Sequence, residues 1–94
     1  MRFTELQIDG ETYKLVWDFN ALCEAEGMTG CSLLSLSTST QMRGAFYASL
    51  RTYHSQVDLA GAGRLIGIAG VARVMEALGA AFELSTGKKE VVTQ

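Results

Sequence analysis

The spacing of apolar residues changes near Trp17, and this change constrains the fold more than any other feature of the sequence. In residues 3–8, and again in residues 12–17, apolar and polar residues alternate, which is typical of β-strands with one buried face. Asp9-Gly10 separates the two runs and is a strong signal for a short hairpin turn. The first part of the chain is therefore predicted to form a β-hairpin.

Helical spacing begins directly after this hairpin. Asp18 is a suitable N-cap, because its carboxylate accepts hydrogen bonds from the free N–H groups of a first helical turn. Phe19 and Leu22 then recur at the spacing of one helix face, and Gly27 is the predicted C-terminal stop. Trp17 and Phe19 are thus close enough in the chain for the hairpin and the helix to share one hydrophobic centre.

The hairpin has one apolar face that must be covered. A two-residue turn would pair Leu6 with Tyr13 across the strands. A four-residue loop would shift the partners but leave the same residues on that face, because side chains alternate with a period of two. An isolated hairpin is marginal in water, so helices or another subunit are expected to pack on it. The apolar face comprises Leu6, Ile8, Tyr13, Leu15 and Trp17.

Further helices are predicted after a linker. Residues 28–40 are rich in serine, threonine and glycine, and Ser32 is expected to cap one short helical turn there. Residues 41–54 form the clearest helical stripe, Asp58 is expected to cap the next helix, and Gly70 is expected to end it. The inward positions of these helices are Met42, Ala45, Phe46, Leu50, Tyr53, Leu59, Ala62, Leu65, Ile66, Ala69, Val71, Val74, Met75, Leu78, Ala81 and Phe82.

These elements predict an α+β fold, with an N-terminal β-hairpin followed by about four α-helices in one small domain. Residues 1–84 are expected to form that domain, and residues 85–94, which are polar and have no periodicity, to form a flexible C-terminal tail. The predicted core comprises Leu6, Ile8, Tyr13, Leu15, Trp17, Phe19, Leu22, Phe46, Leu50, Val74, Leu78 and Phe82.

No pattern of catalytic or metal-binding residues emerges from the sequence. Cys23, Cys31 and the single His54 have neither the number nor the spacing of a zinc site, and both thiols are expected to stay reduced. Glu24 and Glu26 are poorly placed for an acid/base pair, because residues two apart on a helix point in different directions. They predict a solvated acidic face instead. His54 has no acidic partner and is expected to interact with the dipole at a helix end. We therefore predict no enzymatic activity, metal, cofactor or small-molecule substrate.

The apolar stretch 59–82 allows two other interpretations. The glycines of residues 61–67 have the wrong spacing for a dinucleotide fingerprint and no hydrophobic strand before them, so they predict close helix packing. The stretch is apolar enough for a membrane span, but three charged residues interrupt it. The net charge of -2 argues against nucleic-acid binding, and no secretion signal is apparent. A cytoplasmic protein without a membrane partner is expected.

A resemblance to a known family begins in the hairpin. Residues 8–15 (Ile-Asp-Gly-Glu-Thr-Tyr-Lys-Leu) and residues 18–24 (Asp-Phe-Asn-Ala-Leu-Cys-Glu) resemble the small tail assembly chaperones of long-tailed phages and gene transfer agents. Those proteins open with a similar hairpin and then a similar helix start. Residues 42–53 also resemble a helix of that family, and Asp58-Leu59 stands where its next helix begins. The similarity extends over about residues 3–84, and its motifs are structural.

The resemblance implies a function in tail assembly. A chaperone of this family binds the long, helical tape measure protein in the host bacterial cytoplasm while the tail tube polymerises around it, so the tail tube protein is a second possible partner. The alternative is a small regulatory or antitoxin-like domain that binds a protein or DNA. A DNA-binding module needs a recognition helix with clustered basic residues, and no predicted helix has more than two.

Three apolar side chains are left over by the predicted core. Phe3 and Val16 fall on the polar face of the hairpin, and Tyr47 falls off the inward stripe of its helix. Apolar groups exposed near one another often mark a binding site. We therefore expect these three residues to contact either the tape measure protein or a second copy of the chain, since free hairpin edges also favour a homo-oligomer.

Overall fold

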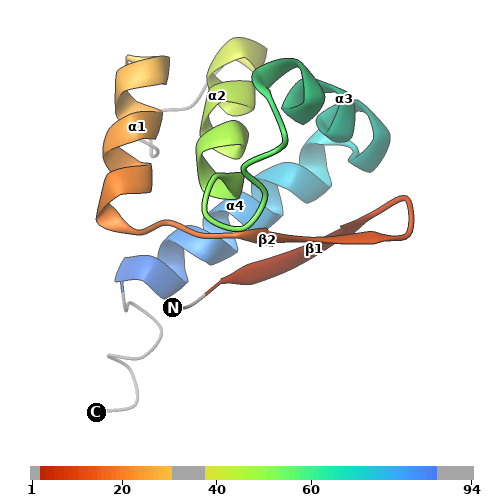
Figure 1. Cartoon of the computed structure of the whole chain (residues 1–94), viewed down its shortest axis with the longest axis horizontal. Helices are drawn as coiled ribbons and strands as arrows, with labels where there is room; N and C mark the ends of the chain where they lie inside the picture. The colour runs from red at the N-terminus through yellow and green to blue at the C-terminus, as the bar shows by residue number, and fades with distance from the viewer. Residues whose placement is uncertain (1–2, 31–37, 87–94) are drawn as a thin grey trace.

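The computed structural model describes residues 3–30 and 38–86 of the chain. It confirms the α+β prediction, with a two-stranded antiparallel hairpin followed by four helices in the described part of the chain (Figure 1). The predicted turn at Ser32 and most of the predicted tail lie outside the described residues. The elements are β1 (Thr4–Ile8), β2 (Glu11–Leu15), α1 (Phe19–Thr29), α2 (Ser39–Leu50), α3 (Leu59–Ala69) and α4 (Val71–Thr86).

The hairpin has the two-residue turn that its sequence predicts. Asp9 and Gly10 both have positive φ angles, 53° and 85°, as a type I′ turn requires. Leu6 therefore pairs with Tyr13, as expected for a two-residue turn. Arg73 connects α4 to β1: its Nη2 donates a hydrogen bond to the carbonyl oxygen of Gln7 at 2.6 Å.

Helix α1 begins as predicted but ends later. The Oδ1 of Asp18 accepts a hydrogen bond from the backbone N–H of Ala21 at 2.7 Å, which makes Asp18 the N-cap. The stop predicted at Gly27 is wrong, since the helix continues to Thr29 and Gly30 is its C-cap with φ 74°. One glycine inside a helix costs only about 1 kcal/mol, whereas the cap needs a residue in the left-handed region, which Gly30 occupies.

Helix α2 is shorter at its C-terminal end than predicted. Thr38 caps it through a capping box with Gln41, so the helix begins at Ser39 and ends at Leu50. Tyr53, which was expected on the inward stripe, therefore lies in the turn beyond the helix and is 43% exposed. Residues expected on this stripe inside the helix are buried: Met42, Ala45, Phe46 and Leu50.

Helices α3 and α4 meet at a sharp corner. Asp58 caps α3, with its Oδ1 accepting from the N–H of Gly61 at 2.7 Å, as predicted. Gly70 separates the helices with φ 97°, and the two helices are bent by 113° relative to each other. The predicted inward stripe of α4 is partly wrong, because Val71 and Met75 are 56% and 38% exposed.

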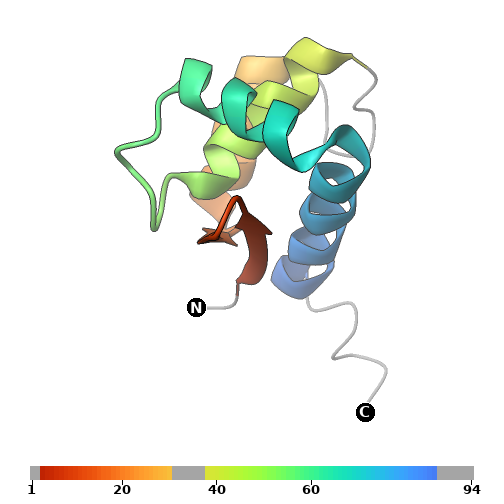
Figure 2. The ribbon, with the colours of Figure 1, turned by 90° about the vertical axis from the view of Figure 1, so that its right-hand side faces the viewer.

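The core lies between the hairpin and the helices. In Figure 2 the hairpin lies beside α4, and α2 lies above the hairpin. Phe46 of α2 is the largest completely buried side chain among the described residues, and Trp17 donates a hydrogen bond from Nε1 to the carbonyl oxygen of Leu78 at 3.3 Å. The predicted core residues that are buried are Leu6, Ile8, Leu15, Trp17, Phe46, Leu50, Val74 and Leu78; those only partly buried are Tyr13, Leu22 and Phe82. Predicted core residue Phe19 begins α1, but its side chain lies outside the described part of the structure.

Small residues make up much of the rest of this core. Alanine side chains let the helices approach one another closely, since they fill little space between the backbones. The buried alanines are Ala21, Ala25, Ala45, Ala48, Ala62, Ala77 and Ala81.

Candidate protein-binding surface

The described residues offer little to metal or nucleotide chemistry. Within residues 3–30 and 38–86, no group of three or more histidine, cysteine, aspartate and glutamate side chains could hold a metal ion. Cys23 is an exposed free thiol, and Cys31 lies outside the described residues. The glycine-rich residues 61–67 lie inside helix α3, not in a loop that follows a strand. Of these glycines, Gly63 lies against Arg43 of α2, as expected for close helix packing, whereas a Cβ at Gly67 would meet nothing within 4 Å.

The apolar stretch of residues 59–82 is divided between two helices, α3 and α4. In the described part of the chain, no single helix is long and apolar enough to cross a membrane. Helices α3 and α4 would meet the criteria of length and composition only together, and they are bent by 113° at Gly70.

Val16 does not lie on the surface as predicted. It is only 1% exposed, and its backbone N–H donates to the carbonyl oxygen of Ser49 at 2.9 Å. The alternation of the strand applies only up to Leu15, where β2 ends. Beyond that point the chain turns onto α2, so Val16 is drawn into the core together with Trp17.

Phe3 contacts other residues of this chain. Its ring meets that of Tyr53 edge to face, with the centroids 5.7 Å apart. The Nζ of Lys14 lies 4.8 Å from the Phe3 centroid and 5.0 Å from the Tyr53 centroid, so the ammonium interacts with both π systems. Phe3 is half-buried in this cluster and still partly accessible to a partner.

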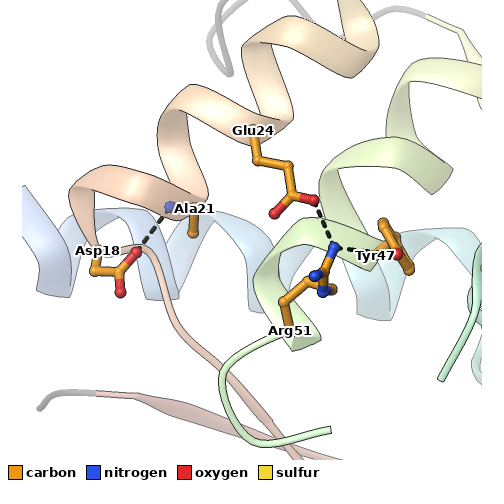
Figure 3. A network of polar contacts seen from close by, with 5 residues as sticks. All are labelled: Asp18, Ala21, Glu24, Tyr47 and Arg51. Atoms are coloured by element: carbon orange, nitrogen blue, oxygen red, sulfur yellow. Dashed lines mark hydrogen bonds and ion pairs between the residues drawn. The ribbon is translucent and has the colours of Figure 1, made fainter. Parts of the chain in front are cut away.

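Tyr47 belongs to a separate network that joins α1 to α2 (Figure 3). The Nη1 of Arg51 donates to the Oε2 of Glu24 at 2.7 Å and to the hydroxyl oxygen of Tyr47 at 3.2 Å. The guanidinium carbon also lies 5.4 Å from the centre of the tyrosine ring. Tyr47 packs partly against the core, and its contact with Arg51 is separate from the contacts of Phe3 with Tyr53 and Lys14.

His54 has a different environment from the helix end predicted for it. Its Nε2 accepts a hydrogen bond from the backbone N–H of Lys14 at 2.9 Å, and its ring lies 5.1 Å from that of Tyr13. An acceptor nitrogen requires the neutral imidazole. Burial, and then the charge of Lys14, lower the pKa of His54 below its ordinary value of 6.5. His54 therefore acts as a neutral acceptor at the edge of β2.

Large apolar side chains are exposed where α3 turns into α4. Val71 is 56% exposed and Met75 is 38% exposed, one helical turn apart on the same side of α4. Ile68, near the end of α3, is 59% exposed and borders a different pocket with Tyr13 and Leu65. Val71 and Met75 thus form a short apolar ridge that the core leaves uncovered.

Val71 also borders a pocket between α2, α3 and the beginning of α4, which we call the corner pocket. The pocket has a volume of about 220 Å³ and is open to solvent. Its lining combines apolar side chains with Ser39 and Thr40 of the first turn of α2, and the N-terminus of a helix favours negative charge. The residues lining it are Ser39, Thr40, Met42, Arg43, Gly63, Ile66 and Val71.

Among the described residues that line the corner pocket, only Arg43 is charged. Its Nε atom is buried and has no hydrogen-bond partner among the described residues. A buried donor without a partner costs about 1–3 kcal/mol. The stem of Arg43 passes close to Gly63, where an added Cβ would lie 3.2 Å from the arginine Cδ. The pocket therefore combines an apolar surface with an unsatisfied positive donor.

Sequence reasoning placed Val71 and Met75 inward and thus missed this surface. Among the described side chains of α4, those of Val74, Ala77, Leu78 and Ala81 are buried, and their spacing defines an inward stripe. Met75 lies about 100° around the helix from Val74, which places it beside that stripe. The predicted stripe included Ala81 but not Ala77, and counting Ala77 as a core residue instead of the larger Met75 would have revealed the shift.

The chain was compared with family models, with curated protein sequences and with solved structures, and none of them matches it.

Proposed function

We propose that this protein is a tail assembly chaperone of a phage, a prophage or a gene transfer agent. In this proposal it binds the tape measure protein in the bacterial cytoplasm before and during polymerisation of the tail tube. It has no catalytic role and needs no cofactor. Its task is to cover apolar segments of a long helical partner that would otherwise aggregate.

Local structure in the region of resemblance supports the proposal. The residues that resemble the family form a hairpin with a two-residue turn and then a helix capped by Asp18. Helix α3 likewise begins after Asp58, where the family resemblance places a helix start. These features agree with the resemblance at the level of secondary structure.

The observation that carries the proposal is the exposed apolar ridge of Val71 and Met75 beside the corner pocket. Single exposed apolar side chains are common on protein surfaces, but neighbouring ones next to a pocket often mark a binding site. A chaperone for apolar helices needs such a surface in its free state. A DNA-binding domain instead needs a basic surface, and the chain has a net charge of -2.

Co-expression tests the proposal directly. The chain is produced together with the tape measure protein encoded near it, and in parallel the tape measure protein is produced with an unrelated small acidic protein. We expect the tape measure protein to stay soluble and to co-purify only with this chain. A tape measure protein that is equally soluble in both cases, and that does not co-purify, would contradict the proposal.

A gel-shift measurement with random duplex DNA at low salt tests the alternative function. We expect no shift, because the described helices carry no cluster of basic residues on one face. Tight binding that weakens steeply with added salt would favour a regulatory DNA-binding domain instead.

A further inference from the structure

We propose that the corner pocket is the docking site for one helix of the partner, and that this helix presents a carboxylate beside an apolar stripe. The carboxylate pairs with Arg43, and the stripe packs on Val71 and Met75. The inference rests on the proposed function for the identity of the partner. It adds the surface that is used and the chemistry that this surface recognises.

Arg43 determines the charge of the partner. Its Nε is buried without a hydrogen-bond partner among the described residues, and the described residues lining the pocket include no acidic side chain. Because Nε is buried in the free protein, a carboxylate reaches it only when the Arg43 side chain changes its rotamer. A carboxylate entering the pocket then accepts from Nε and a terminal guanidinium nitrogen together, which is the geometry that arginine and carboxylate groups favour. A neutral partner would leave this donor unsatisfied.

Val71 and Met75 determine the shape of the partner. They lie one turn apart on α4, and Val71 also lines the corner pocket, so the ridge and the pocket are continuous. A ridge of helical side chains packs well into the groove between side chains of another helix. An amphipathic helix laid on such a surface is a common mode of recognition. The occupant is therefore a helix with apolar residues at helical spacing.

A second copy of the chain fits this surface less well. In a two-fold dimer, both subunits contribute the same surface to the interface, so the corner pocket of one copy would face the corner pocket of the other. Such a contact would bring two Arg43 side chains toward each other with no acidic residue among the described lining residues to separate them. Charge complementarity therefore favours a different molecule with a carboxylate at this position.

Binding measurements with matched variants test the docking site. Overlapping peptides of the tape measure protein, together with a model helix carrying a leucine stripe and one glutamate, are labelled and titrated by fluorescence anisotropy. Arg43→Gln is compared with Arg64→Gln, because Arg64 is an exposed arginine that lines the pocket beside Tyr13 and Leu65 and not the corner pocket. Val71→Ser is compared with Ile68→Ser, since these apolar side chains are similarly exposed but only Val71 lines the corner pocket. Circular dichroism checks that each variant is folded.

We expect Arg43→Gln and Val71→Ser each to raise the Kd for the bound peptide about tenfold or more, and the two control variants to leave it within about twofold. Replacing the glutamate of the model helix by glutamine is expected to weaken binding to the wild type but not to Arg43→Gln. This coupling is the signature of a direct contact between the two groups.

Other outcomes separate the inference from the proposed function. If tape measure peptides bind but respond only to Ile68→Ser and Arg64→Gln, the function stands and the docking site is wrong. If only the model helix binds, and does so through Arg43, the docking site stands and the tape measure protein is the wrong partner. If neither probe binds, or if Val71→Ser instead dissociates a homodimer in light scattering, the docking inference is overturned.

Discussion

At the scale of single residues, His54 joins the turn after α2 to the hairpin. The Nε2 of its neutral ring accepts a hydrogen bond from the backbone N–H of Lys14. This N–H lies at the free edge of β2 and would otherwise be available to another strand. The groups facing the ring are Tyr13, whose ring lies 5.1 Å away, and Lys14. Protonation would remove the acceptor and place a second positive charge near Lys14. The contact is therefore sensitive to pH.

This sensitivity gives a prediction with a definite sign. Burial, and then Lys14, lower the pKa of His54 in the folded protein, whereas the unfolded chain keeps the ordinary value of 6.5. The unfolded state thus binds more protons, and the free energy of unfolding rises with pH across this window. We expect the stabilisation from His54 to be complete above its unfolded pKa and to be lost as the pH falls below it. Urea unfolding between about pH 5 and about pH 7.5 measures this dependence.

His54→Gln is the control for this prediction, because glutamine does not titrate. All other groups are the same in both proteins, so the difference between the two pH profiles isolates His54. Parallel profiles over the whole range would show that the contact with Lys14 does not depend on the protonation of the ring.

At the scale of elements, two glycines at the end of α3 have opposite roles. Gly67 lies inside the helix, and a Cβ there would meet nothing within 4 Å. Gly70 has φ 97° at the corner, and its N–H donates to the carbonyl oxygen of Ile66 at 2.8 Å. Only Gly70 needs the conformational freedom of glycine, because other residues rarely adopt positive φ angles.

Alanine at each position should therefore change stability in opposite directions. We expect Gly67→Ala to raise the free energy of unfolding by about 0.5–1 kcal/mol, since alanine has less backbone entropy to lose. Gly70→Ala should lower it by about 1–3 kcal/mol, because alanine is strained at that backbone conformation. Thermal and urea unfolding of both variants provide the measurement. A stabilised Gly70→Ala protein would mean that the corner adopts another geometry.

At the scale of the whole molecule, one hydrophobic cluster connects the hairpin with all four helices. Phe46 is 0% exposed within it, and Trp17 contributes both its ring and a hydrogen bond to the backbone of α4. Because no element has a separate core in the described structure, the domain should unfold in one cooperative step. A change at one buried position should then destabilise the hairpin and the helices together.

Phe46→Ala tests this single core. We expect it to lower the free energy of unfolding by about 3–5 kcal/mol, a large part of the stability of a small domain. Far-ultraviolet circular dichroism, which reports the helices, and the fluorescence of Trp17, which reports the hairpin side, should lose their signals at the same denaturant concentration. Tyr53→Ala, an aromatic change at a 43% exposed position, should cost far less. An unchanged melting curve for Phe46→Ala would refute its place in the core.

Local signals in the sequence were sufficient for the elements. Asp9-Gly10 specifies its turn because both residues tolerate positive φ, and Asp18 and Asp58 specify helix starts because their side chains bond to N–H groups only three residues away. Gly70 likewise marks the helix break. Each of these interactions involves residues that are neighbours in the chain, so it can be predicted without knowledge of the tertiary fold.

The surface could not be predicted in the same way, because exposure depends on what packs against each residue. Val16 looked exposed by strand alternation, yet the chain turns onto α2 immediately after β2 and buries it. Val71 and Met75 looked buried by helical spacing, yet they are exposed, because the side of α4 that packs into the core is the one that carries Val74, Ala77, Leu78 and Ala81. Sequence patterns therefore determined the elements and most of the core of this protein. Only the tertiary structure decided which apolar groups remain for a partner, because those positions depend on contacts between residues far apart in the chain.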